Sequence, residues 1–222
     1  MVIAIGLTGC LKEDMDTIVL PFSEIPQGEV PQDIKGPFYG VVPINEGIDP
    51  PSINGKFVMS PFKLEYASDG YQENVYGMAD LYLSFQSQTT GGMAAYYEKQ
   101  GLSETESPEV YVVGSGQDFT AYFVAYTTNY IYYDNMYHEV TAKSATIISG
   151  TVAENGIENI KYAFAILEKK DPYNLIMDVN ACRVFRDEDG LAEKCEWSKS
   201  ASDEAKCQSQ KCTRSVKTEK ME

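Results

Sequence analysis

The residue types that carry chemistry are few in this chain, and its single histidine is His138. A Ser-His-Asp hydrolase would need that histidine as its general base. The chain has no Gly-x-Ser-x-Gly segment that would present a nucleophilic serine. We therefore interpret His138 as an isolated exposed side chain, and we expect no catalytic residues and no enzymatic activity.

Tyrosines are concentrated in residues 126–137, which read YTTNYIYYDNMY. A tyrosine ring offers flat apolar surface and a hydroxyl group, which suits stacking on a sugar or on a protein partner. Tyrosine also favours strands, and this structural alternative carries more weight because no tryptophan joins the cluster. The candidate ligand-binding residues are Tyr130, Tyr132, Tyr133 and Tyr137, of which we expect Tyr130 and Tyr132 to be exposed.

Two other segments resemble ligand loops only in part. Residues 114–117 are glycine-rich but precede a predicted strand, so they lack the helix N-terminus that cradles a phosphate. Residues 186–190 have carboxylates at alternate positions, as calcium loops do, but no bidentate acid follows at the required spacing. We interpret both as turns, and we expect no metal and no cofactor.

Four cysteines lie late in the chain: Cys182, Cys195, Cys207 and Cys212. In an oxidising compartment a disulfide could attach the polar tail to the folded body, and four cysteines allow three pairings. A zinc site with four thiolates is the alternative, but the close Cys-x-x-Cys pairs that favour such sites are missing.

The elements that would position these residues are short β-prone segments separated by turn residues. We predict strands at 56–59, 62–66, 78–85, 93–97, 110–113, 119–126, 130–133, 144–152, 161–167 and 175–185. Such spacing is typical of an all-β sandwich or barrel. The connections are short, so most neighbouring strands should pair as antiparallel hairpins, with the tyrosines on a hairpin between 119–126 and 139–152.

The long meander order favours a barrel, and a two-layer β-sandwich is the close alternative. The segment Ile53-Asn54-Gly55-Lys56-Phe57 resembles the Gly-x-Trp opening of lipocalin-like barrels, with phenylalanine in place of tryptophan. In that family the tryptophan plugs the floor of the barrel, so the resemblance implies a similar place for Phe57.

The all-β domain is expected at 55–192, between two polar flanks. Residues 10–54 are rich in proline and glycine and predict an extended tether, with an edge strand around Phe38–Val42. Residues 193–222 contain few apolar side chains and predict a polar, cysteine-containing tail.

The first residues form an apolar run that ends in Leu7-Thr8-Gly9-Cys10. These four residues resemble a bacterial lipobox, which implies that residues 1–9 are a signal peptide and that Cys10 is lipidated. Lys12-Glu13-Asp14 resembles the surface-export tag of lipoproteins in Bacteroidota-type bacteria. Together they imply an outer-membrane lipoprotein at the cell surface; a buried first strand with an incidental cysteine is the alternative.

The formal net charge is −15, which disfavours nucleic acid as a partner because an acidic surface repels phosphate backbones. We therefore expect a lipid-anchored binding module that captures a glycan or a small apolar molecule. The alternative is a structural or adhesive component that binds envelope proteins. A hydrolytic enzyme ranks last.

Overall fold

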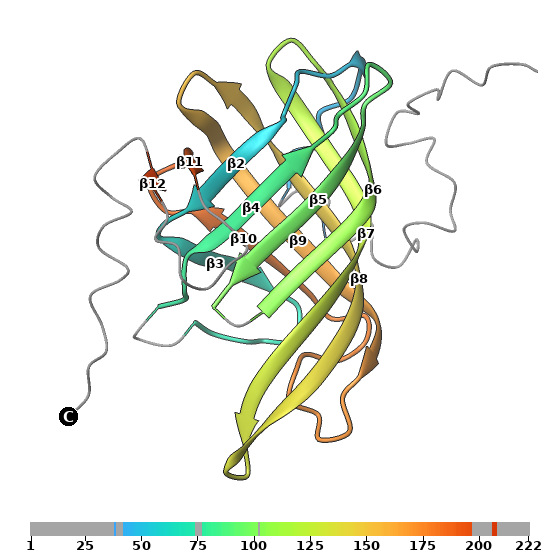
Figure 1. The fold of residues 1–222 in the computed structure, drawn as a ribbon, viewed down its shortest axis with the longest axis vertical. Coiled ribbons are helices and arrows are strands. Elements are labelled where there is room, and N and C mark those ends of the chain that lie inside the picture. The colour runs from blue at the N-terminus through green and yellow to red at the C-terminus, as the bar shows by residue number, and fades with distance from the viewer. Residues whose placement is uncertain (1–37, 39–41, 74–76, 102, 197–205, 208–222) are drawn as a thin grey trace, which may run out of the picture.

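The computed structural model describes residues 38, 42–73, 77–101, 103–196 and 206–207, and these residues form an antiparallel β-fold (Figure 1). The prediction of an all-β meander is confirmed. The strands are β1 (Ile48–Asp49), β2 (Gly55–Met59), β3 (Phe62–Ala67), β4 (Leu81–Gln86), β5 (Met93–Gln100), β6 (Ser103–Ser115), β7 (Asp118–Tyr133), β8 (Met136–Ala153), β9 (Gly156–Lys170), β10 (Cys182–Asp187), β11 (Leu191–Glu196) and β12 (Lys206–Cys207).

The sheet closes into a ring, as Figure 1 shows in its upper part. From β4 to β9 each strand pairs antiparallel with the next in sequence. Strand β11 pairs with β9 on one edge and with β2 on the other, and β2 pairs with β4. Strand β10 pairs with β9 farther along that strand, at residues 161–165, and its other edge pairs with β3. The fold is therefore a barrel rather than a two-layer sandwich.

Closure brings the backbones of β9 and β11 unusually close at Gly156. A Cβ atom at this position would lie 2.1 Å from the carbonyl oxygen of Ala192, which is closer than any real contact. Glycine is therefore required where the ring closes, because only a residue without a side chain leaves room for the neighbouring backbone.

One half of the barrel interior is densely packed. Successive side chains of a strand point to opposite faces, so every second residue faces inward. The packed half contains Phe57, Phe85, Phe119, Phe123 and Ile148, each at most 3% exposed. Phe57, which takes the place of the tryptophan in the Gly-x-Trp pattern, lies in this core. The aromatic volume fills this half of the barrel.

Part of the outer surface of the barrel is also buried. Phe38 and Val42 pack on outward-facing residues of β6 to β10, among them Ile147 and Val184. The N–H of Val42 donates to the carbonyl of Phe38 at 3.0 Å. The rest of the edge strand expected at Phe38–Val42 lies outside the described residues. The side-chain amide of Asn45 donates to the carbonyl of Phe119 at 3.0 Å, which fixes the chain against the barrel wall.

Several strand boundaries differ from those expected. β7 and β8 extend to a two-residue turn, Asp134-Asn135, whose φ angles of 51° and 62° are those of a type I′ hairpin. Residues 175–181 precede β10 as a loop rather than a strand. β11 continues to Glu196, past the boundary expected at 192, because its pairing with β2 provides backbone hydrogen bonds whatever the polarity of its side chains. The expected tether also contributes β1, which pairs parallel with β6.

Candidate functional site

The barrel interior contains a cavity of about 460 Å³, and its lining includes Thr127 and Asn129 of β7 and Ala142 of β8, which lead toward the β7–β8 hairpin. The side chains that line it come from β3 to β10 and from the loops before β4 and β10. The apolar lining includes Phe62, Leu81, Phe164, Ile166, Ile176, Met177 and Phe185. Hydroxyl and amide groups of Ser103, Thr105, Thr127, Asn129 and Ser144 interrupt this lining. Tyr71 and Gln100 also belong to the lining and are partly exposed to solvent.

A buried carboxyl group lies at the inner end of this cavity. Glu98 on β5 is 7% exposed and belongs to the cavity lining. The hydroxyl of Tyr162 donates to Glu98 Oε1 at 3.0 Å, and the hydroxyl of Tyr96 donates to Oε2. Thr105 provides a third side-chain hydrogen bond. We call Glu98, Tyr96, Thr105 and Tyr162 the Glu98 cluster.

The protonation of the Glu98 cluster follows from its burial. Burial raises the pKa of Glu98, and the hydrogen bonds from Tyr96, Thr105 and Tyr162 lower it in part. Burial, together with the nearby charge of Glu98, raises the pKa of Tyr96 and of Tyr162 well above the ordinary value. The tyrosines therefore keep their protons and act as hydrogen-bond donors to the carboxyl group.

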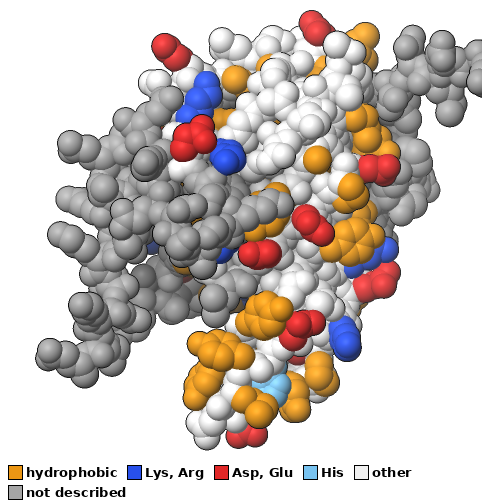
Figure 2. All heavy atoms as spheres, viewed as in Figure 1, with side chains coloured by type: hydrophobic (Ala, Val, Ile, Leu, Met, Phe, Trp, Pro, Cys, Tyr) orange, Lys and Arg blue, Asp and Glu red, His pale blue; other side chains and the backbone are white. Residues whose placement is uncertain are grey.

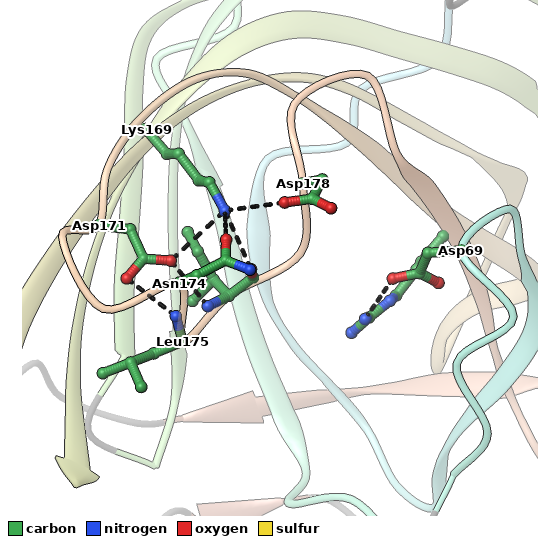
Figure 3. A network of polar contacts seen from close by, with 8 residues as sticks. Asp69, Lys169, Asp171, Asn174, Leu175 and Asp178 are labelled. Carbon is green, nitrogen blue, oxygen red and sulfur yellow. Dashed lines mark hydrogen bonds and ion pairs between the residues drawn. The ribbon is translucent and has the colours of Figure 1, made fainter. Parts of the chain in front are cut away.

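The loop between β9 and β10 covers one side of the cavity and is fastened by Lys169 (Figure 3). Lys169 Nζ donates to Asn174 Oδ1 at 2.6 Å and to the carbonyl oxygen of Ile176 at 3.2 Å, and it lies 3.3 Å from Asp178 Oδ1. One ammonium group thus joins three points of the loop and places Ile176 and its neighbour Met177 against the cavity.

Asp171 organises the same loop from its other end (Figure 3). Its carboxylate accepts the N–H groups of Leu175 and Ile176 at 2.9 and 3.0 Å. Burial acts to raise the pKa of Asp171, but the two N–H donors and Lys169 outweigh it, so the pKa lies below its ordinary value. Asp171 therefore stays ionised and holds the backbone of the loop.

A second charged pair lies where the cavity opens. Arg183 Nη2 lies 2.7 Å from Asp69 Oδ2, and the guanidinium carbon lies 3.8 Å from the ring centroid of Tyr71. Burial raises the pKa of Asp69, but the hydrogen bonds from Arg183 and Tyr71 outweigh this effect and leave the pKa lowered. Arg183 Nε is buried and has no hydrogen-bond partner among the described residues.

The four candidate tyrosines lie at the tip of the β7–β8 hairpin, where Figure 2 shows hydrophobic side chains gathered around the histidine. Tyr130, Tyr132, Tyr133 and Tyr137 are 47%, 61%, 49% and 63% exposed. The expected exposure of Tyr130 and Tyr132 is confirmed. They are not core residues of the barrel.

The hairpin separates these tyrosines into two faces. Tyr132 pairs across the ladder with Tyr137, and their ring centroids lie 5.2 Å apart. Tyr130 is on the same, outer face, where its hydroxyl donates to Glu139 at 3.2 Å. Tyr133 is on the opposite face, which continues the inward-facing residues of β7. The structure therefore does not bring the four together as one platform.

The inner face of the hairpin forms a different aromatic group. The ring of His138 lies 4.5 Å from that of Tyr173 in the β9–β10 loop, and Tyr133 lies 5.9 Å from Tyr173. His138 Nε2 lies within 3.0 Å of the carbonyl oxygen of Tyr133. His138 thus contacts aromatic rings and a backbone carbonyl rather than an acid and a nucleophile.

The cysteines fall into different environments. Cys182 is a buried free thiol packed on the outside of the barrel, so its expected place among the disulfide candidates is wrong. Cys195 is disulfide-bonded, and its backbone pairs with that of Cys207 across β11 and β12. Cys10 and Cys212 lie outside the described residues.

The described part of the chain has neither a membrane-spanning helix nor a cluster of metal-ligating side chains. No helix there is long and apolar enough to cross a membrane. No group of three or more His, Cys, Asp or Glu side chains within those same ranges is arranged to hold a metal ion. At residues 187–190 the acids bind backbone instead: Asp187 accepts the N–H of Ser60 at 2.8 Å, and Asp189 accepts that of Leu191 at 3.2 Å.

Sequence reasoning missed the Glu98 cluster and Arg183. A signal for Glu98 was present in β5, where Glu98 follows the buried Ala94 and Tyr96 on one face of the strand. An acid at an inward-facing position indicates a buried carboxyl group that needs partners. One of its partners, Tyr162, lies 64 residues away on another strand, which the sequence alone does not indicate.

Comparison with known proteins gives no match: no family model, no curated protein and no solved structure matches the chain. The function must therefore be inferred from the cavity and the surface themselves.

Proposed function

We propose that this protein is a binding module that holds a small, largely apolar ligand in the barrel cavity. The supporting observation is the contrast between the two halves of the barrel. One half is filled by phenylalanine and aliphatic side chains, and the other leaves about 460 Å³ open between walls of the same kind. Protein interiors normally pack densely, and cavities of 300–1,000 Å³ are the usual size of small-molecule sites.

Two further features distinguish the cavity from a simple packing defect: an anchored loop over it and polar groups in its walls. The β9–β10 loop is fixed over it by Lys169 and Asp171, and polar groups are distributed along apolar walls. A few oriented polar groups within an apolar pocket are typical of sites that select one ligand. No catalytic role is proposed.

For the location we propose a lipid anchor at Cys10, in the outer membrane and facing outward. The supporting residues are Leu7-Thr8-Gly9-Cys10 and Lys12-Glu13-Asp14. A diacylglyceryl group has two chains, which anchor a protein stably where one chain does not. Replacing Cys10 with Ser should abolish acyl labelling and release the protein from the membrane fraction. Acyl labelling that persists in this variant would contradict the anchor.

The function is tested by a thermal-shift screen of the full chain against lipids, haem and glycans. A ligand that binds only the folded state raises the melting temperature, and the stabilisation grows with the logarithm of the ligand concentration once that concentration exceeds Kd. We expect a shift with small apolar compounds, and no shift across the whole panel would count against the proposal.

The outer face of the β7–β8 hairpin supports a second candidate, namely binding of a glycan or an envelope protein. Tyr130, Tyr132 and Tyr137 present exposed rings there, next to Tyr126, which is 54% exposed. Exposed aromatic groups of this kind are frequent in binding surfaces. A partner that co-purifies with the wild type and is lost from a Tyr130→Ala, Tyr132→Ala variant would favour this role.

A further inference from the structure

The charges in the cavity wall are unequally compensated. The lining contains one acidic side chain, Glu98, and one basic side chain, Arg183. Arg183 already pairs with Asp69 at 2.7 Å, so this pair is close to neutral. None of the ion pairs among the described residues includes Glu98. Its partners are the neutral hydroxyls of the Glu98 cluster.

Hydrogen bonds from these hydroxyl groups favour the ionised form of Glu98, but they do not use all the acceptor positions of its carboxylate. Tyr96, Thr105 and Tyr162 supply three hydrogen bonds. A carboxylate offers about four acceptor positions, so one remains for a donor in the cavity. A ligand that brought a positive charge would supply what the protein does not: a counter-charge to a carboxylate buried in an apolar site.

Aromatic rings line the same cavity. Phe62 stacks on Phe185 with ring centroids 4.6 Å apart, and Phe62 lies 6.1 Å from Tyr162. All three rings belong to the cavity lining. The faces of aromatic rings attract organic cations, and ammonium groups are commonly recognised by several rings at once. A carboxylate and three rings therefore favour the same ligand group.

We infer that the ligand of this cavity is a small organic cation, with an amine nitrogen at Glu98 and an apolar body extending toward Ile176 and Met177. The inference rests on the proposed function, since it requires that a ligand occupies the cavity. The alternative is an uncharged ligand that only donates a hydrogen bond to Glu98. A cation adds the attraction between opposite charges to the hydrogen bond that an uncharged donor would make with Glu98, so it should bind at least roughly tenfold more tightly than its neutral counterpart.

The test compares octylamine, octanol and octanoate, which share one apolar chain and differ in charge. Each is titrated against the full chain carrying Nile red, a neutral apolar dye, and displacement is followed by fluorescence. The salt concentration is kept at or above about 0.15 M, where attraction to the acidic outer surface is screened. We expect octylamine to displace the dye at least roughly tenfold more effectively than octanol, and octanoate to be the weakest.

The Glu98→Gln variant should lose the preference for octylamine and still bind octanol. Glu158→Gln, which removes an exposed carboxylate from β9, is the matched control and should keep the preference. Equal displacement by octanol and octylamine in the wild type would overturn the inference and leave the proposed function intact. Failure of all three compounds and of the dye to bind would overturn the proposed function itself. The wild-type comparison decides even if Glu98→Gln does not fold.

Discussion

The hydroxyl of Tyr162 and the carboxyl group of Glu98 meet at 3.0 Å across the inside of the barrel. Tyr162 is on β9 and Glu98 on β5, and no ladder joins these two strands. Their hydrogen bond therefore connects opposite walls of the ring, at the level where the packed interior ends and the cavity begins.

Replacing Tyr162 with Phe should lower the free energy of unfolding by about 1–3 kcal/mol, because a buried carboxyl group loses one of its donors. Chemical denaturation with urea measures this change. Tyr126→Phe, which removes a hydroxyl from the exposed face of the hairpin, is the control and should have little effect. Equal stability of the Tyr162→Phe variant and the wild type would show that Glu98 does not depend on this bond.

The stability of the protein should depend on pH through Asp187. Burial, and then the neighbouring Asp189, raises the pKa of Asp187 from 3.8 to about 7. Between these values the folded state keeps the proton that the unfolded state releases, so the free energy of unfolding falls as the pH rises. Each unit of pKa difference corresponds to about 1.4 kcal/mol.

The Asp187→Asn variant has no proton to release at this position. Denaturation curves recorded from pH 4 to pH 8 should therefore show a smaller decline for the variant than for the wild type. Asp49→Asn, an exposed substitution in β1, should follow the wild type. Parallel curves for Asp187→Asn and the wild type would rule out the raised pKa.

Replacing Lys169 with Met should loosen the β9–β10 loop, because the loop loses an ammonium group that joins three of its residues. Hydrogen exchange at the N–H groups of Leu175 and Ile176 should become faster. Lys170→Met removes a neighbouring charge and is the control. Unchanged exchange at Leu175 and Ile176 would mean that Asp171 alone holds the loop.

Removing two exposed tyrosines, Tyr130→Ala with Tyr132→Ala, should change the melting transition little, since substitutions at exposed positions usually change stability by less than about 0.5 kcal/mol. If these rings bind a glycan or a protein, the same pair should weaken that binding by about 1–3 kcal/mol. A large drop in melting temperature would reject a binding role and assign the rings to the fold.

The general architecture could be predicted from the sequence because it depends on local patterns. Turn residues between β-prone segments indicated an antiparallel meander, and Asp134-Asn135 forms the kind of two-residue turn that such hairpins favour. Ring closure depends instead on contacts between distant segments. Glu193 of β11 pairs with Val58 of β2. The polar side chains from Glu193 onward had indicated a tail rather than a strand.

The candidate site could be predicted less well, for a related reason. The tyrosine hairpin was recognisable because its residues are consecutive, and their exposure followed from their polar neighbours. The cavity is formed by single residues from many strands, and Glu98 is separated from Tyr162 by 64 positions. Inward and outward positions alternate along each strand, but the sequence does not show which inward positions enclose empty space.

The central claim is that the unfilled half of the barrel binds a ligand. The most direct measurement is a Nile red titration of the wild type and of two variants. Ala142→Phe adds a ring inside the cavity, whereas Thr128→Phe adds the same ring to the outer face of β7. We predict saturable binding of one dye molecule by the wild type and by Thr128→Phe, and loss of that binding in Ala142→Phe. Equal binding by Ala142→Phe would place the dye elsewhere and contradict the account.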